Sequence, residues 1–183
     1  LFKMKRTKLI LVTLIICITT ITAQEQTKGV NKGLGFGFQI NQFQKDFGLG
    51  LNFTTPYFGY DKIALRLRGN LMFNEHIHNL ATTWTPYTNL SLGLIGVGGT
   101  IGDFIRLYGE SGVIGLLPSA DFSSKKFEFG GYGLFGFEFF MNKYINYFIE
   151  LGGIGTGAQA DKIMSKPIYS NGFLIDVGLR VCL

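Results

Sequence analysis

Large apolar residues alternate with small or polar residues along most of this chain, which is the period of a β-strand. In the stretch from Ile63 to Phe73, the polar residues Arg66, Arg68 and Asn70 share one face. The opposite face carries Ile63, Leu65, Leu67, Leu71 and Phe73. A soluble sandwich would leave the arginines in water, whereas a membrane barrel turns its apolar face to lipid and encloses the charges. The continuous apolar face favours the membrane barrel.

Eight stretches with this alternation predict an all-β fold, an eight-stranded antiparallel up-and-down transmembrane β-barrel. The expected strands cover residues 33–42, 48–56, 62–74, 87–100, 104–117, 126–140, 146–157 and 171–183. Each Arg beyond residue 23 falls within one of these strands. The alternation therefore predicts that the arginines lie inside the barrel.

The links between these strands differ in length. Short links are expected near 59–61, 102–103 and 142–145, and longer ones at 75–86, 118–125 and 158–170, with a short hairpin at 43–47. In an outer-membrane barrel the short links are periplasmic turns and the longer links face outward. An extracellular ligand is expected at the three longer links, because loops on a rigid scaffold carry binding functions.

The first residues resemble a secretory signal. Four basic residues (Lys3, Lys5, Arg6 and Lys8) precede an apolar run that ends in Ile21-Thr22-Ala23. The run is shorter than the roughly 20 residues that a transmembrane helix needs. We expect cleavage after Ala23, so that residues 1–23 form a signal peptide and residues 24–183 form the barrel domain.

Removing this leader changes the charge of the chain. The net charge falls from +5 to +1, because four basic residues and no acidic residue leave with the leader. A basic face for nucleic acid is therefore not expected. Of the two cysteines only Cys182 stays, which excludes an internal disulfide in residues 24–183.

The charged residues of the strands predict an ion-pair network in the lumen. If the strands on either side of residue 122 pair symmetrically, Arg106 lies opposite Glu138. The same symmetry about residue 144 places Glu138 opposite Glu150, and about residue 165 it places Glu150 opposite Arg180. Cross-strand neighbours interact directly, and the interior of an eight-stranded barrel is just wide enough for its own side chains. The predicted network, which would close the lumen, comprises Arg66, Arg68, Arg106, Glu110, Glu138, Glu150, Asp176 and Arg180.

Candidates for chemistry are few. Glu75, His76 and His78 cluster at the end of a strand. Alternation places the two histidines on one face, a spacing that can hold a metal, but no third strong ligand lies nearby. The stretch His76 to Asn79 is similar to the His-x-Ser-Asn stretch of outer-membrane lipid A deacylases, but His78 occupies the place of the nucleophilic Ser. Glycine-rich stretches such as 130–137 alternate with apolar residues and precede no helix, so no nucleotide cofactor is expected. The sequence thus predicts neither an enzyme nor a cofactor or metal site.

Aromatic residues near the strand ends resemble the interfacial girdles of membrane barrels. These residues are Tyr57, Phe58, Tyr60, Trp84, Tyr87, Tyr144, Tyr147 and Tyr169.

Three stretches, 55–65, 104–110 and 136–144, resemble the small porin-family outer-membrane β-barrel proteins, whose architecture is related to OmpA- and OmpX-type barrels. The resemblance implies an eight-stranded barrel in the outer membrane of a Gram-negative bacterium, in contact with outer-membrane lipid and inserted by the barrel-assembly machinery. Such chains usually end in an aromatic residue that this machinery reads, whereas this one ends Val181-Cys182-Leu183. The expected role is structural or in surface interaction. The alternative is a small porin-like channel or carrier for ions or apolar solutes, and the two differ in whether the lumen is plugged.

Overall fold

The structure, a computed structural model, describes residues 30–78 and 81–183. The predicted signal peptide at 1–23 and Asn79 of the deacylase-like stretch lie outside the described residues. Within the described part of the chain, no helix is long and apolar enough to cross a membrane.

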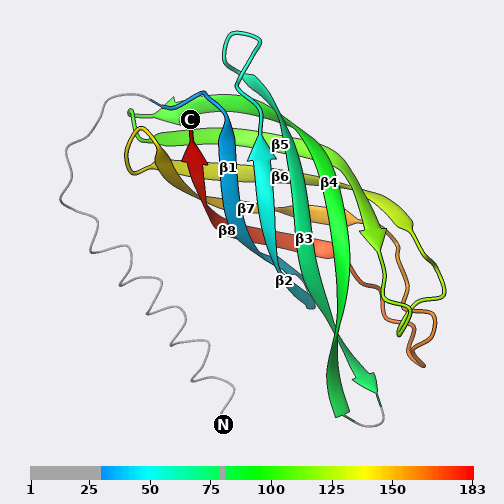
Figure 1. Ribbon diagram of the computed structural model, residues 1–183. Helices are drawn as coiled ribbons and strands as arrows, with labels where there is room; N and C mark the ends of the chain where they lie inside the picture. Colours follow the sequence, from blue (N-terminus) through cyan, green and yellow to red (C-terminus); the bar gives the residue numbers. More distant parts are fainter. Residues whose placement is uncertain (1–29, 79–80) are drawn as a thin grey trace.

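The described residues form a closed antiparallel β-barrel, which confirms the predicted fold class. Its eight strands are β1 (Gly35–Phe43), β2 (Asp46–Thr54), β3 (Ile63–His78), β4 (Ala81–Ile101), β5 (Ile105–Leu117), β6 (Glu128–Phe140), β7 (Ile145–Gly155) and β8 (Gly172–Cys182). The first strand closes the barrel, because Phe38 pairs with Leu51 of β2 on one side and with Leu179 of β8 on the other. Figure 1 shows these strands wrapped around one axis.

The connections divide between two ends of the barrel. Residues 55–62, 102–104 and 141–144 lie at the end that also holds residues 30–34 and the C-terminus, which we call the terminal end. The β1–β2, β5–β6 and β7–β8 connections lie at the opposite end, the loop end, where β3 also ends and β4 begins (Figure 1). This arrangement follows from the up-and-down order of the strands.

The predicted loop at 75–86 is wrong, because most of it belongs to two long strands. The β3–β4 pairing continues to His78 and Ala81, whereas β2 pairs only as far as Asn74 and β5 only as far as Thr88. The last residues of β3 and the first of β4 therefore form a two-stranded ribbon that extends past the loop end (Figure 1). The threonines at 82, 83 and 85 favour strand over loop. Polar residues on both faces of the ribbon account for the wrong prediction.

The strand alternation separates an apolar exterior from a polar interior. On β1, Phe36 is 53% and Phe38 47% exposed, while Gln39 and Asn41 are fully buried. The same division holds on β2, where the exposed Leu49 and Leu51 flank the inward-facing Gly50. An exterior of this kind is unsuited to water but matches a lipid environment.

The residues of the predicted aromatic girdle divide into exposed ones, which an interfacial position requires, and enclosed ones, which cannot belong to a girdle. The exposed members are Phe58, Tyr60, Trp84 and Tyr144. Tyr87 and Tyr169, in contrast, are 3% and 1% exposed and lie inside the loop end, and Tyr57 packs over Arg106 at the terminal end. These three tyrosines close the barrel ends and do not belong to an outer belt.

Candidate functional site

The middle of the lumen is filled by a cluster of ion pairs, here called the central cluster. Its members are Arg66 and Arg68 of β3, Glu110 of β5, Glu150 of β7 and Asp176 of β8. Alternation points all five inward, and each is at most 3% exposed.

Each arginine of the central cluster joins two walls of the barrel. Nη1 of Arg66 lies 2.8 Å from Oε2 of Glu110 and 2.7 Å from Oε1 of Glu150. Arg68 reaches the same two carboxylates at 2.6 Å each, and its Nη1 lies 3.0 Å from Oδ2 of Asp176. The guanidinium groups thus cross the barrel from β3 to β5, β7 and β8.

A second group of charges, the terminal cluster, lies toward the terminal end. Arg106 donates to Oε2 of Glu138 at 2.9 Å, and Arg180 donates to the other oxygen of Glu138. Arg106 also donates to the Asn31 carbonyl, and its guanidinium lies 4.2 Å from the centre of the Tyr57 ring. This cluster therefore ties the segment before β1 and the β2–β3 connection across the terminal end.

The predicted single row of cross-strand partners is wrong beyond its first pair. Arg106 does face Glu138. Glu138, however, faces Phe148, and Glu150 faces Asp176 where Arg180 was expected. Relative to the predicted pairing, the register is shifted by two residues between β6 and β7 and by four between β7 and β8. Because both shifts are even, every side chain stays on its predicted face. All eight predicted residues consequently lie inside the barrel, but in two clusters.

Two tyrosines that sequence reasoning missed complete the central cluster. Tyr108 donates to Oε1 of Glu150, and Tyr132 donates to Oε1 of Glu110 at 2.7 Å. Each ring lies over a glycine: a Cβ at Gly136 would overlap Tyr108, and one at Gly93 would overlap the Tyr132 hydroxyl. Inward glycines, on the adjacent strand for Tyr108 and two strands away for Tyr132, were thus the available signal for these two aromatic rings.

Neutral amides fill the β1–β4 side of the lumen. Asn52 donates to Gln39 at 2.8 Å, Gln39 and Asn41 both donate to Asn70, and Asn70 donates to Asn89 at 2.7 Å. Arg180 donates to Asn52 at 3.1 Å, which connects this chain of amides to the terminal cluster. The amides occupy the part of the lumen that the charged residues leave open.

The loop end is closed by a second device, the loop cap, formed by residues 118–127 and 156–171. Phe122 is fully buried and packs edge-on against Tyr87 and Tyr169, with ring centres 6.1 and 4.9 Å away. The His76 ring also lies 6.4 Å from the Phe122 ring. Burial raises the pKa of Tyr169 to about 12, so the tyrosine stays neutral under ordinary conditions. The expected outward loops therefore fold over the mouth of the barrel.

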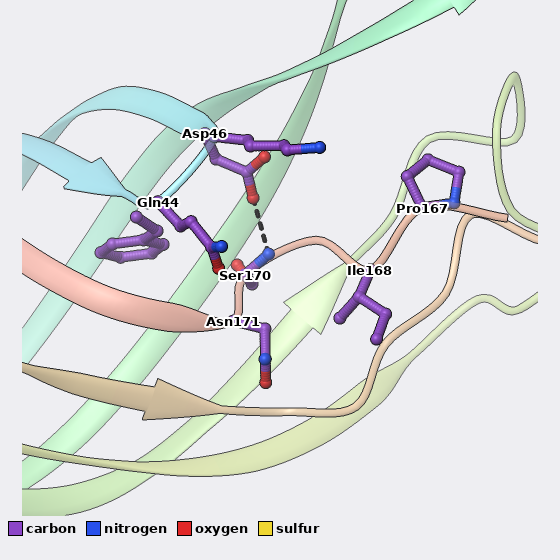
Figure 2. Close-up of a pocket in the computed structure, with 8 residues that line it drawn as sticks. Gln44, Asp46, Pro167, Ile168, Ser170 and Asn171 are labelled. Atoms are coloured by element: carbon purple, nitrogen blue, oxygen red, sulfur yellow. Dashed lines mark hydrogen bonds between the residues drawn. The ribbon is translucent and has the colours of Figure 1, made fainter. Parts of the chain in front are cut away.

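Asp46 fastens the loop cap to the barrel wall. Its Oδ2 accepts hydrogen bonds from the Ser170 backbone at 2.6 Å and from the Tyr87 hydroxyl at 2.7 Å. Its Oδ1 accepts one from Asn74 at 2.7 Å. Figure 2 shows Asp46 reaching from the start of β2 to Ser170. The β7–β8 connection is thus held against both β2 and β4.

The two segments of the cap are also joined to each other. Asp161 accepts hydrogen bonds from the Ser124 backbone at 2.7 Å and from the Ser124 hydroxyl. Lys162 donates through its Nζ to the Ala120 carbonyl at 2.6 Å. The hydrogen bonds from Ser124 lower the pKa of the exposed Asp161 carboxyl.

This shift predicts that the contact between the two cap segments depends on pH. The pKa of Asp161 is lower in the folded cap than in the unfolded chain, so the stabilisation is fully present above the ordinary carboxyl pKa of about 3.9. It is lost as the pH falls through the lowered pKa. We expect the Ser124 amide to lose hydrogen-exchange protection over that range, measured by NMR in micelles relative to Ile114 of β5.

The matched variants for this measurement are Asp161→Asn and Asp121→Asn. Asp161→Asn should remove the pH dependence of Ser124 protection, whereas Asp121→Asn, at another exposed carboxylate of the cap, should keep it. Protection of Ser124 that is unchanged throughout acid titration of the unmodified protein would contradict the prediction.

Two shallow pockets flank the cap on the outside. One of about 240 Å³ is lined by residues such as Gln44, Asp46, Pro167 and Asn171 (Figure 2). The other, of about 360 Å³, lies between the ribbon and the cap and includes Lys45, which lines both pockets. The outer surface is therefore hollowed beside the cap, and both carboxylate oxygens of Asp46 are already occupied by the cap contacts.

The candidates for metal or catalytic chemistry lie apart from the lumen clusters. His76 packs on Phe122 and Glu75 is exposed, whereas the side chain of His78 lies outside the part that the structure describes. Among the described residues, no three His, Cys, Asp or Glu side chains gather closely enough to hold a metal ion. Glu138 and Glu150 are both engaged by arginines, which favours a structural role for the two carboxylates.

Comparison with solved structures confirms the resemblance at the level of the fold. The N-terminal β-barrel domain of OprF from Pseudomonas aeruginosa aligns with 84% of this chain and 98% of its own, at a TM-score of 0.54 and 13% identity. The outer membrane protein OprG from the same organism aligns with 84% of this chain and 95% of its own, at a TM-score of 0.40 and 16% identity. Neither a protein-family model nor a curated protein sequence matches the chain.

Proposed function

We propose that this chain is an outer-membrane β-barrel of a Gram-negative bacterium, with a closed lumen and a structural or surface-interaction role. The observation that carries the proposal is that charges fill the inside while the outside is apolar. Arg66 and Glu150 are fully buried in the lumen, whereas Leu67 and Leu92 on the outside are 52% and 50% exposed. This inside-out arrangement suits a protein surrounded by lipid and not one surrounded by water.

A closed lumen favours a role other than transport. The terminal cluster, the central cluster and the loop cap lie in series along the barrel axis, and a solute would have to displace all three. The alternative of a small channel or carrier requires these elements to open together. The interior of an eight-stranded barrel offers little spare space for such a movement.

The partners follow from the same geometry. Outer-membrane lipid would cover the exposed apolar belt, and the barrel-assembly machinery would insert the chain after removal of residues 1–23. An extracellular ligand would meet the loop end, which presents the ribbon at 75–86 and the cap segments 118–125 and 158–170. No carboxylate, hydroxyl or imidazole arrangement in the described residues favours an enzymatic role over this one.

The test of the compartment is fractionation with a gel assay. The protein should sediment with outer membranes, resist carbonate extraction and migrate differently when left unheated, because closed barrels survive detergent. Leu92→Arg, in the apolar belt, should lower the assembled fraction, since Arg on a lipid face costs up to about 2–4 kcal/mol. The same change at the exposed Thr82 of the ribbon should have little effect. A soluble periplasmic pool containing all of the protein would contradict the proposal.

A further inference from the structure

The charges of the central cluster do not balance. Two guanidinium groups, Arg66 and Arg68, face three carboxylates, which are Glu110, Glu150 and Asp176. The other two lumen arginines, Arg106 and Arg180, are both bound to Glu138 in the terminal cluster. The eight lumen charges balance as a whole, but the central cluster holds one negative charge more than its own arginines neutralise, and the matching positive charge lies with Glu138 in the terminal cluster.

The surplus charge falls on Asp176. Glu110 and Glu150 each contact both arginines of the cluster and also accept a tyrosine hydroxyl. Asp176 receives only Nη1 of Arg68 at 3.0 Å, and the same Nη1 lies closer to Glu150, at 2.6 Å. Among the described residues Oδ1 of Asp176 has no hydrogen-bond partner, although the side chain is only 3% exposed.

A small cavity lies beside Asp176. It has a volume of about 10 Å³, and its polar lining comes from Arg68, Asn70, Ser91, Tyr132 and Asp176. This is close to the smallest space that holds one water molecule, so only a small ion or a single water fits. The cavity therefore limits the size of any group that can bind Oδ1 of Asp176.

We propose that Asp176 binds one small monovalent cation, a proton or a sodium ion, which neutralises the central cluster. A buried carboxylate that shares its one guanidinium partner with a second carboxylate is unfavourable, and hard cations prefer oxygen ligands such as the Asp176 carboxylate and the Ser91 hydroxyl. Polyatomic cations larger than a water molecule do not fit the cavity. The site depends on the burial of the cluster and not on the closed lumen of the proposed function.

The groups that surround Asp176, besides Ser91 of β4, come from five strands. They are Asn41 of β1, Arg66 and Arg68 of β3, Glu110 of β5, Tyr132 of β6 and Glu150 of β7. Glu150 lies directly opposite on the neighbouring strand, so two carboxylates face each other in the ladder. Like charges in this position repel each other, and Nη1 of Arg68 is shared between the two carboxylates.

Cation binding can be measured through unfolding equilibria in detergent micelles. A ligand that binds only the folded state lowers the unfolding constant by the factor 1 + [L]/Kd, up to tenfold for each tenfold rise in concentration. One arm replaces choline chloride with sodium chloride at constant ionic strength, and the other lowers the pH from 8 to 6. We expect the unmodified protein to be stabilised in one of these arms.

The informative variant is Asp176→Asn, which keeps the size of the side chain and removes its charge. It should lose that cation dependence without losing the fold. The matched control is Asp46→Asn, an equally buried aspartate whose two oxygens are both occupied, and it should keep the dependence. Equal dependence in the unmodified protein and in Asp176→Asn, or none in either, would overturn the proposal.

Infrared spectroscopy of protein with labelled aspartate tests the site even if Asp176→Asn does not fold. A carboxylic-acid band that Asp46→Asn retains indicates a bound proton, and a carboxylate band that sodium shifts indicates the ion. Absence of both from the unmodified protein would refute the site. If the barrel conducts ions and its stability still depends on the cation, then the closed lumen of the proposed function is refuted and the cation site is not.

Discussion

Replacing Arg68 with leucine is expected to lower the free energy of unfolding by about 3–5 kcal/mol, the usual cost of removing one partner from a buried ion pair. Arg68 contacts three carboxylates, Glu110, Glu150 and Asp176, and its own side chain is 3% exposed. Its loss would leave these carboxylates facing Arg66 alone. The surplus of negative charge in the central cluster would rise from one to two.

Urea titration of the refolded protein in micelles would measure this loss. Lys125→Leu is the control, because Lys125 pairs with Glu128 on the surface and its side chain is 60% exposed. Exposed pairs of this kind contribute at most about 1 kcal/mol. Equal stability of Arg68→Leu and Lys125→Leu would show that the central cluster does not contribute to folding as its burial implies.

The strands of the barrel wall could be predicted from the sequence because they alternate over most of their length, apart from irregularities such as the register shift between Val97 and Gly99. A side chain in a strand has only two directions, so an apolar outer face leaves Arg66, Arg106 and Glu150 only the inner one. This reasoning needs no knowledge of neighbouring strands. It extends to the order of the strands, because short links join antiparallel neighbours.

Contacts across the lumen could not be predicted in the same way. The partner of Glu150 depends on the register of β7 and β8, and that register depends on how residues 156–171 fold into the loop cap. A shift by an even number of residues keeps every side chain on its face and changes only its partner. The alternation pattern therefore does not reveal such an error.

The loop cap was missed because its residues carry no periodic pattern. Phe122 and Tyr169 stand in polar surroundings in the sequence, next to Ser123 and Ser170. Their burial comes from tertiary contacts with Tyr87, a residue that alternation assigns only to a strand end. Two of the predicted binding loops consequently form part of the closure of the barrel.

Purified protein in planar bilayers is expected to show no steady, well-defined conductance. The lumen is crossed by the central cluster and closed again by the cap, where Phe122 and Tyr169 are 0% and 1% exposed. Because the obstructions lie in series, the least open one sets the current. Stable, ion-selective channels from the unmodified protein would falsify the closed lumen and favour the channel alternative.

Opening the barrel therefore requires changes at more than one level. One variant shortens all eight lumen charges to serine, which removes four positive and four negative charges and leaves no ion unpaired. A second, Phe122→Ser with Tyr169→Ser, loosens the cap. We expect little conductance from either variant alone and a clear leak from their combination, since only the combination shortens the charged side chains and the cap aromatics together.

The unheated gel shift decides whether each variant still forms a barrel before its conductance is interpreted. Shortened side chains leave cavities that lower stability, but a closed ladder of eight strands keeps its backbone hydrogen bonds whatever fills the lumen. A leak from the cap variant alone would mean that the charged clusters let ions pass and that the cap is the true barrier. A folded combination that stays silent would contradict the assignment of the charged side chains and the cap aromatics as the obstruction, and would leave Tyr108, Tyr132 and the chain of amides as the barrier.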